Sequence, residues 1–464
     1  MTWSSPAQKP GVVLFERWKR LAEYTMRLAR KILWVLAVAA CVGFAVVGDS
    51  AGVESDDQFL LRLQRLAVNY FWVEANPANG LVRDRSRADS KCSVAAVGFG
   101  LSSIVVGIEQ GWIPRDDGRR RVLTTLRTLA ETRQGPESSG VSGYRGWFYH
   151  FLEMDSGHRA WKCELSTIDT ALLLAGVLDV AAFFEGVDPE DVRVRALAGE
   201  LVRRVDWDWM AAGQSTFSMG WHPESGFLPS RWVGYNEAMI LYLLALGAPD
   251  DDAALPSVSW EAWTRGYRWT RHQGIELVEF APMFGHQYTQ CWVDFRGIAD
   301  SYMKVHGLTY FENSRRATLA QQAYCMEQSR RFTNYSAREW GITACDGPAG
   351  YAARGAPPAE NDDGTLAPTA VAGSLPFAPE VCIPSLRHLE RTYRDRLWGP
   401  YGFRDAFNVT RNWWATDTLG IDQGPMVLMI ENFRTGALWR RMQRNPILRR
   451  GLARAGFSPF PTPP

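Results

Sequence analysis

The stretch Gly143–Val177, GYRGWFYHFLEMDSGHRAWKCELSTIDTALLLAGV, contains the unit from which the fold of this chain can be interpreted. It begins with aromatic side chains, among them Tyr144 and Trp147, and continues through several carboxylates. It ends in an apolar run, Ala171–Val177, that predicts a buried helix. A long loop rich in aromatic and acidic residues therefore leads into an apolar helix.

The same alternation of loops and helices recurs after residue 55. Apolar residues spaced three and four positions apart predict amphipathic helices over residues 56–72, 92–110, 115–133, 165–184, 188–206, 234–246, 257–271, 290–304, 308–329, 379–396, 421–433 and 436–445. Longer loops rich in Gly, Trp, Asp and Glu separate alternate pairs, at residues 73–91, 135–163, 207–233, 273–289, 331–378 and 397–420. Six helical hairpins whose long loops form a groove at one end predict an all-α fold, an (α/α)₆ toroid; a generic all-α domain is the alternative.

The two ends of the chain differ from this pattern. Residues 32–47, ILWVLAVAACVGFAVV, are apolar without a charge and follow three basic residues, which is typical of a signal peptide or a short membrane anchor. We therefore expect residues 1–50 to be a leader, residues 51–445 to be the folded domain, and the basic and Pro-rich residues 446–464 to be a frayed tail. The leader predicts export to the periplasm or outside the cell, with membrane attachment through residues 32–47 if it stays uncleaved.

Composition narrows the classes of function. A net charge of +1 and a pI of about 7.6 provide no global field that attracts nucleic acid. The six Cys beyond the leader form no CxxC and no zinc spacing. We expect neither a metal nor a cofactor. The six Cys are interpreted as buried free thiols, with a Cys325–Cys345 bridge as the alternative. The twenty Trp fit either a large helical core or an aromatic-lined groove. We expect the protein to be a monomer.

Several carboxylates stand at predicted helix starts. Glu164 and Asp169 belong to the string ELSTIDT, where Asp169 suits a first-turn position for structural reasons alone. Glu164 lies just outside the helix, where it can face a groove. Glu237 opens another apolar helix after a Gly/Pro/Trp loop, and the aromatic residues Trp232 and Tyr235 would raise its pKa enough for a general acid.

Asp405 is the candidate for a base that activates water across the groove from Glu237. It lies in a Gly/aromatic turn, and pairing with Arg404 or capping of the turn is the structural alternative. Other polar and aromatic residues near these positions are candidates for stacking on sugar rings or bonding to hydroxyl groups: Tyr144, Trp147, Trp161, Trp232, Tyr235, Asn236, His286, Gln287 and Trp413.

Five strings together resemble a known family: GYRGWFYHFLEMDSGHRAW, ELSTIDTALLLAGVL, GWHPESGFLPSRWVGYNEAMILYLLALG, FGHQYTQCWVDFRGIAD and YGFRDAFN. The family is that of the bacterial endo-β-1,2-glucanases of glycoside hydrolase family 144, which carry a glycoamylase-like domain. The resemblance spans roughly residues 55–435. It implies an (α/α)₆ barrel, β-1,2-glucan as substrate, an inverting mechanism and no metal.

The resemblance also implies residue roles. Glu237 in the YNEA string would be the general acid, and Glu164 and Asp169 would be essential groove carboxylates. Asp405 in the FRDAFN string would be the base, acting through one water or more. Two alternatives remain open, a retaining β-1,2-glucan transglycosylase of the same fold and a glucan-binding protein without catalytic activity. A polysaccharide lyase is disfavoured, because the loops lack an obvious Arg or Lys cluster for a uronate.

Overall fold

The computed structural model describes residues 54–460. The predicted leader and membrane anchor lie outside the described residues and stay a prediction. Within the part described, no helix combines the length and the apolar character that crossing a bilayer requires. The contacts group Ser55–Pro464 into one compact unit, which begins close to the predicted start of the folded domain.

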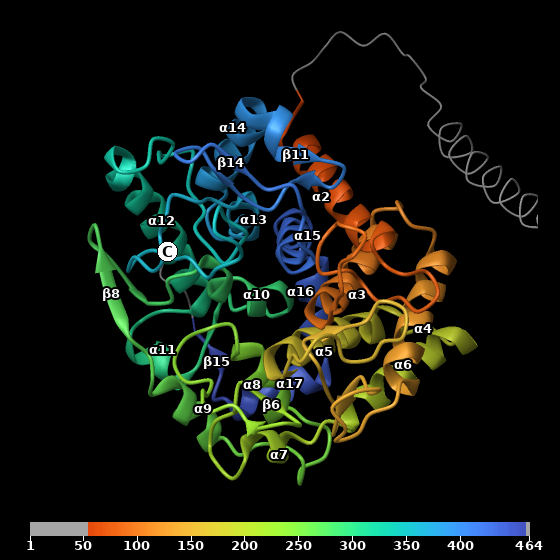
Figure 1. The fold of residues 1–464 in the computed structure, drawn as a ribbon. Helices are drawn as coiled ribbons and strands as arrows, with labels where there is room; N and C mark the ends of the chain where they lie inside the picture. The colour runs from red at the N-terminus through yellow and green to blue at the C-terminus, as the bar shows by residue number, and fades with distance from the viewer. Residues whose placement is uncertain (1–53, 461–464) are drawn as a thin grey trace, which may run out of the picture. The chain divides into compact units, whose positions relative to one another are not determined.

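Inner helices of the described unit alternate along the chain with outer helices that cover them (Figure 1). The inner helices are α3 (Val94–Glu109), α5 (Thr167–Phe183), α8 (Met239–Leu246), α10 (Tyr288–Trp292), α13 (Pro368–Gly373) and α15 (Gly420–Arg434). The outer helices are α2 (Asp56–Val73), α4 (Arg115–Glu131), α6 (Pro189–Arg203), α9 (Val258–Thr264), α12 (Tyr310–Glu327) and α14 (Pro379–Leu397). Together they form six hairpins and confirm the predicted (α/α)₆ architecture.

The remaining elements are short. They include α7 (Trp207–Ala211), α11 (Ser301–Val305), α16 (Ala437–Met442), α17 (Pro446–Arg454) and the 3₁₀ turns η1 (Met283–His286) and η2 (Gln328–Arg330). Antiparallel strands of two to four residues pin the loops together. They pair β1 (Cys92–Ser93) with β4 (Phe151–Leu152), β2 (Gly143–Tyr144) with β3 (Trp147–Phe148), β8 (Trp269–His272) with β9 (Ile275–Val278), β10 (Ile298–Ala299) with β15 (Ser458–Pro459), β11 (Trp398–Gly399) with β12 (Gly402–Phe403), β13 (Phe407–Asn408) with β14 (Trp413–Trp414), and β5 (Leu165–Ser166) with β6 (Gly220–His222) and β7 (Gly226–Phe227).

Inner and outer helices differ in how they are buried. The inner helices are apolar on almost every face, and α8, α10 and α13 are buried at every position. An outer helix such as α4 buries one stripe only, which is the amphipathic pattern of a helix that covers a core. Gly98 and Gly176 let α3 and α5 approach closely, because a Cβ on Gly176 would lie 2.0 Å from the Gly98 carbonyl oxygen.

Several predicted boundaries are wrong. Residues 290–304 do not form one helix, since α10 ends at Trp292 and α11 begins at Ser301. The predicted helix 257–271 ends at Thr264, before strand β8. The predicted loop 331–378 contains the inner helix α13, whose six residues PTAVAG are too few to give a periodic signal. These corrections leave the number of hairpins unchanged.

The predicted tail is also wrong for its described part. Residues 446–454 form α17, which packs on α8 so closely that a Cβ on Gly451 would meet the Leu243 carbonyl oxygen at 2.0 Å. Strand β15 then pairs with β10. The basic side chains of 440–454 had suggested a solvated tail, but the apolar side of α17 completes the domain.

Candidate active site

A cavity of about 640 Å³ opens where the loops that precede the inner helices meet. Loop residues before α3, α5, α8 and α13 contribute to its wall, together with the first turns of α5 and α15. Its lining residues are Asp84, Arg85, Arg87, Ser93, His150, Phe151, Trp161, Ile168, Asp169, Leu172, Glu237, Phe284, Tyr288, Asp346, Gly350, Tyr351, Leu419 and Ile421. The predicted groove at one end of the toroid is therefore present, and the predicted loop 331–378 contributes Asp346, Gly350 and Tyr351 to it.

Glu237 lies on this wall directly before α8. Its Oε2 atom is buried and has no hydrogen-bond partner among the described residues. Burial raises the pKa of Glu237 to about 7, and the negative charge of Asp169 acts in the same direction. The carboxyl group therefore holds a proton near neutral pH and can donate it to an atom in the cavity.

His150 connects the two predicted carboxylates of the α5 loop. Its Nδ1 lies 2.9 Å from Oε1 of Glu164, and its Nε2 lies 3.6 Å from Oδ1 of Asp169. Burial opposes a charge on His150, but Asp169 and Glu164 outweigh it and raise the imidazole pKa to about 9. The pKa of Glu164 is lowered: burial opposes ionisation, while the hydrogen bond and the charge of His150 favour it more strongly. Asp169 lines the cavity, whereas Glu164 stands behind His150.

Arg85 organises a second group of charges on the wall. It donates to both carboxyl oxygens of Asp346, at 3.0 and 3.3 Å, and to Asp84 at 3.3 Å. A third carboxylate, Asp417, lies 3.6 Å away. Burial raises the pKa of Asp84, with Arg85 opposing the shift. Three loops that are far apart in the sequence are thus joined through one guanidinium group.

Asp405 lies behind this group and is not among the lining residues. It is fully buried, and its Oδ2 accepts a hydrogen bond from the Asp346 backbone N–H at 2.7 Å. Arg404 donates instead to the Thr416 carbonyl at 2.7 Å, so the pairing of Arg404 with Asp405 that the sequence allowed is absent. Burial, with the nearby charge of Asp346, raises the pKa of Asp405 to about 7.

Trp161 is the most exposed aromatic residue of the wall. Its side chain is 64% exposed, and its backbone is left-handed with φ of 51°, a strained conformation for a residue with a Cβ. Phe151 contacts its ring edge at 5.1 Å between centroids and stacks in turn on His150 at 4.0 Å. This arrangement presents a flat apolar face beside the charged groups, which suits the apolar face of a sugar ring.

None of the other predicted binding residues is among those that line the cavity. Trp147 is fully buried and donates to the Asp206 carbonyl, while Trp232 donates to the Thr167 hydroxyl at 2.8 Å. The Gln287 side-chain amide donates to the Ala370 carbonyl. Trp413 packs against a small buried cluster that includes Met283 and Ala406. The lining also omits Tyr144, Tyr235, Asn236 and His286.

Local contacts account for the positions of these side chains. Tyr144 packs on Trp209 and Trp221, and the Asn236 amide accepts from the Ala238 N–H inside the turn. Tyr235 stacks on a tyrosine of α12. His286 is buried, which lowers its pKa to about 4, and its Nε2 bonds to the Phe280 carbonyl. These side chains hold the loops in place, which the composition of the strings could not reveal.

Sequence reasoning missed several lining residues: Asp84, Arg85, Arg87, His150, Phe151, Phe284, Tyr288, Asp346 and Tyr351. A signal for His150 existed, since an imidazole inside the aromatic patch can pair with the carboxylates of the same loop. The charged run Asp84–Arg87 before an apolar helix was a second signal. The thiols Cys325 and Cys345 are free, so the alternative bridge is not formed.

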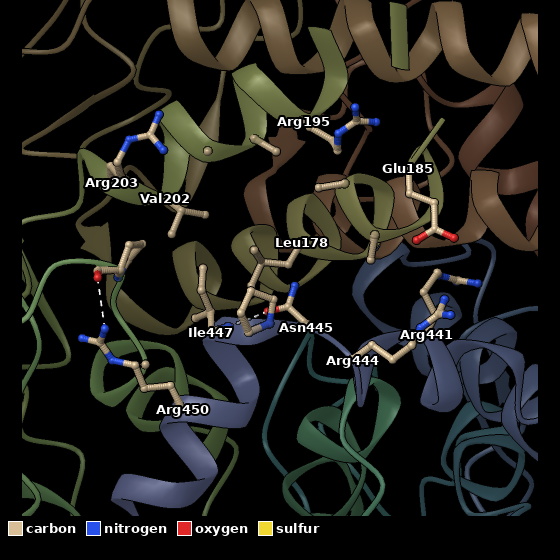
Figure 2. A pocket seen from close by; sticks show the side chains of 17 residues that line it. Leu178, Glu185, Arg195, Val202, Arg203, Arg441, Arg444, Asn445, Ile447 and Arg450 are labelled. Carbon is tan, nitrogen blue, oxygen red and sulfur yellow. Dashed lines mark hydrogen bonds between the residues drawn. The ribbon is translucent and has the colours of Figure 1, made fainter. Parts of the chain in front are cut away.

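A second cavity, of about 580 Å³, lies at the C-terminal half of α5 (Figure 2). Glu185 is the only carboxylate among its lining residues, and the labelled arginines surround apolar side chains such as Leu178 and Ile447. Arg195 donates to the Phe184 and Gly186 carbonyls, and Arg441 to Asp179. These arginines stabilise the fold, and the cavity lacks the paired carboxyl groups of the first one.

The chain matches known proteins over most of its length. The Glycoamylase family, described as "putative glucoamylase", matches residues 229–446. A curated relative from Parabacteroides distasonis, an exo β-1,2-glucooligosaccharide sophorohydrolase (non-reducing end), is 29% identical over 429 residues, which cover 86% of this chain and 58% of that protein. The chain thus spans a little over half the length of this relative.

Solved structures of the same fold extend the match. An endo-β-1,2-glucanase from Chitinophaga pinensis, solved with sophorotriose and glucose, is 27% identical with a TM-score of 0.80, covering 87% of this chain and 99% of that one. A "putative glucoamylase" from Bacteroides uniformis is 32% identical, also with a TM-score of 0.80, covering 87% of this chain and 98% of that one. By this similarity over nearly the whole described unit, the chain belongs to the glycoamylase family.

Proposed function

We propose that this chain is a glycoside hydrolase that cleaves β-1,2-linked glucan by an inverting general acid/base mechanism. The observation that carries the proposal is Glu237, a carboxyl group on the cavity wall whose pKa is raised to about 7. A protonated carboxyl group beside a second carboxyl group is the minimum that glycoside hydrolysis needs. The substrate is proposed from the names of the Parabacteroides and Chitinophaga relatives.

Glu237 is the general acid in this proposal. It donates its proton to the glycosidic oxygen as the bond to the anomeric carbon breaks, and it becomes a carboxylate. Asp169 supports this role because its charge opposes ionisation of Glu237 before the reaction. After product release, Glu237 takes a proton back from solvent.

Asp405 is the proposed base. Since its side chain is fully buried behind Asp346, it accepts the proton of the attacking water through intervening water or hydroxyl groups rather than by direct contact. Both carboxyl oxygens of Asp346 accept hydrogen bonds from Arg85. Asp346 is therefore better suited to orient substrate or water than to take a proton. Attack by water on the face opposite the leaving group inverts the anomeric carbon.

The remaining wall supplies binding contacts. Trp161 offers a flat exposed face for a glucosyl ring. Asp84 and Asp169 are carboxylates on the wall that can accept hydrogen bonds from sugar hydroxyls. The apolar side chains Phe284 and Leu172 keep the space around Glu237 dry, which sustains its raised pKa.

Product analysis tests the proposal. The purified chain is incubated with linear β-1,2-, β-1,3- and α-1,4-glucans, and the first products are identified by NMR before the anomers equilibrate. We expect cleavage of the β-1,2-glucan alone, with products of inverted configuration. A retained anomer would support the transglycosylase alternative, and binding of glucan without cleavage would support a binding protein. The Glu237→Gln variant, which should bind but not cleave, excludes a contaminating hydrolase.

A further inference from the structure

Asp422 stands next to the proposed base. It lies in the first turn of the inner helix α15 and is 4% exposed, while Asp405 is 0% exposed. The two carboxyl groups lie close enough to act directly on each other's ionisation. Among the ion pairs of residues 54–460, neither carboxyl group contacts an Arg, Lys or His side chain.

The surroundings of this pair indicate that one of the two carboxyl groups is protonated. Asp405 Oδ1 and Asp422 Oδ2 are buried and receive no hydrogen bond from an N–H or hydroxyl group of the described residues. Two carboxylates cannot hydrogen-bond to each other without a proton, and two buried negative charges in contact would repel strongly. A single proton shared between the two groups removes this repulsion and leaves one charge on the pair.

The surroundings indicate where that proton resides. The Asp346 backbone N–H donates to Asp405 Oδ2 at 2.7 Å, which favours the ionised form of Asp405. No N–H or hydroxyl group of the described residues donates a hydrogen bond to the Asp422 side chain, and burial together with the charge of Asp405 raises the Asp422 pKa well above its usual range. The proton therefore belongs mainly to Asp422, whose hydroxyl group donates to Asp405.

Other titratable groups face the pair from each neighbouring loop and helix. Asp84 and Asp346 add negative charge, which favours keeping the proton, and Arg85 opposes them. Tyr288 on α10 and Tyr351 on the cavity wall lie close enough to feel the charge of Asp422, as does the thiol of Cys345. These three groups stay neutral near pH 7, because burial raises the pKa of each.

We propose that Asp422 and Asp405 share one proton, and that Asp422 is a positioning residue that holds Asp405 as a hydrogen-bonded anion. The positioning role of Asp422 in catalysis rests on the proposed function, whereas the shared proton does not. During hydrolysis the attacking water forms a bond to the anomeric carbon and releases a proton, which passes to Asp405. The pair then holds two protons and no charge. It returns one proton to solvent as Glu237 regains the one it gave to the leaving group.

Infrared spectroscopy tests the shared proton without any substrate. At pH of about 8 an ordinary Asp carboxyl, with a pKa near ~3.9, is ionised and shows no carboxylic-acid C=O band. The Glu237→Gln variant serves as the reference, since it removes a carboxyl group of the cavity wall whose raised pKa of about 7 leaves a fraction of it protonated at this pH. We expect this variant to retain a carboxylic-acid band that disappears when Asp422→Asn is added. Persistence of the band in the double variant, or its absence from the reference, overturns the proposal.

Activity profiles test the positioning role. The amide of Asp422→Asn can still donate to Asp405, whereas Asp422→Leu removes the donor at similar size. We expect the acidic limb of the kcat/KM profile to move up by about one to two pH units in Asp422→Leu and by less than about half a unit in Asp422→Asn. Equal shifts in the two variants, or none in either, refute the positioning role. Should the chain cleave no glucan, the proposed function fails, and the infrared result still decides whether the proton is shared.

Discussion

The imidazole Nδ1 of His150 lies 2.9 Å from the Glu164 carboxylate. Its other nitrogen faces Asp169 at 3.6 Å, so each side of the ring meets a negative charge. The pKa of His150 is raised to about 9 by these carboxylates, against the effect of burial, and the ring is a cation at neutral pH. The charge of Asp169 in turn raises the pKa of Glu237. Because the positive charge of His150 offsets that of Asp169, His150 lowers the proton affinity of the proposed acid.

Replacing His150 by Gln should therefore move the alkaline limb of activity. The substitution removes a positive charge beside Asp169, which makes the field at Glu237 more negative and raises the Glu237 pKa further. We expect the pH at which kcat/KM falls on the alkaline side to increase. The maximal kcat/KM should drop by about 10- to 100-fold, because Glu164 and Asp169 lose the group that orients them. The measurement is kcat/KM against pH.

His158 provides the matched control for that variant. It lies in the same loop but is not among the residues that line the cavity. The His158→Gln variant should keep both the wild-type maximum and the position of the alkaline limb. An unmoved alkaline limb in His150→Gln, with the fold intact, would mean that His150 has no electrostatic influence on Glu237.

Glu237→Gln should abolish most of the activity and change stability in a pH-dependent way. Loss of a general acid typically costs 10²–10⁴-fold in kcat, and we expect a loss of about that size. Glu153, which forms an ion pair with Lys91 at 2.7 Å in a loop outside the cavity lining, is the control: Glu153→Gln should stay within about twofold of wild type. Similar losses in the two variants would argue against a specific role for Glu237.

The stability effect follows from the sign of the pKa shift. Because the folded-state pKa of Glu237 is raised from 4.5 to about 7, its contribution to stability is complete below pH 4.5 and is lost as the pH rises through about 7. Above that pH the folded protein must hold a buried charge. Glu237→Gln removes this cost, and we expect it to raise the free energy of unfolding at pH of about 8 by about 1–3 kcal/mol, with little change near pH 4. Thermal or urea unfolding at both pH values measures the difference.

Trp161 should contribute to binding more than to the fold. The residue is 64% exposed, and its backbone φ of 51° is a left-handed value that Gly adopts without strain and a bulky residue does not. We expect Trp161→Gly to raise KM about 10-fold with a much smaller effect on kcat, and to stabilise the fold by about 1 kcal/mol through relief of the left-handed strain. Trp161→Phe should keep most of the affinity. Steady-state kinetics and thermal unfolding of the two variants check this, and an unchanged KM in Trp161→Gly would remove Trp161 from the binding surface.

Long apolar helices were the most predictable part of the fold. The helices α3, α5 and α15 have apolar residues on nearly every face, and their sequences indicate this directly. The helix α13 was missed because its six residues form a helix only where the surrounding core stabilises it. The segment 446–454 was misjudged for a related reason, since its arginines mask a stripe that packs on α8.

Carboxylates at helix starts were the predictable part of the candidate site. Glu237 and Asp169 line the cavity because the inner helices begin at its wall. Aromatic residues were less informative: Trp147 faces the core and Trp161 faces the cavity, although both belong to the same loop. Asp84 and Asp346 could not be paired from the sequence, because the loops that hold them are brought together only through Arg85.

Arg85 should control the acidic limb of activity. Its guanidinium group neutralises Asp84 and Asp346 beside the proposed base, and its charge lowers the Asp405 pKa. In Arg85→Met those carboxylates lose their partner, so the Asp405 pKa should rise and the base should be protonated at a higher pH. We expect the acidic limb of kcat/KM to move up, so that activity falls more at pH of about 6 than at pH of about 8.

Arg404 distinguishes this effect from a general loss of positive charge. It is adjacent to Asp405 in the sequence, but its guanidinium group donates to the Thr416 carbonyl. Arg404→Met should therefore leave the acidic limb in place, although it removes the same charge from the residue next to Asp405 in the sequence. If both variants move the limb equally, the effect arises from net charge and not from the contacts of Arg85. If only Arg85→Met moves it, the carboxylates that Arg85 joins set the proton affinity of the base.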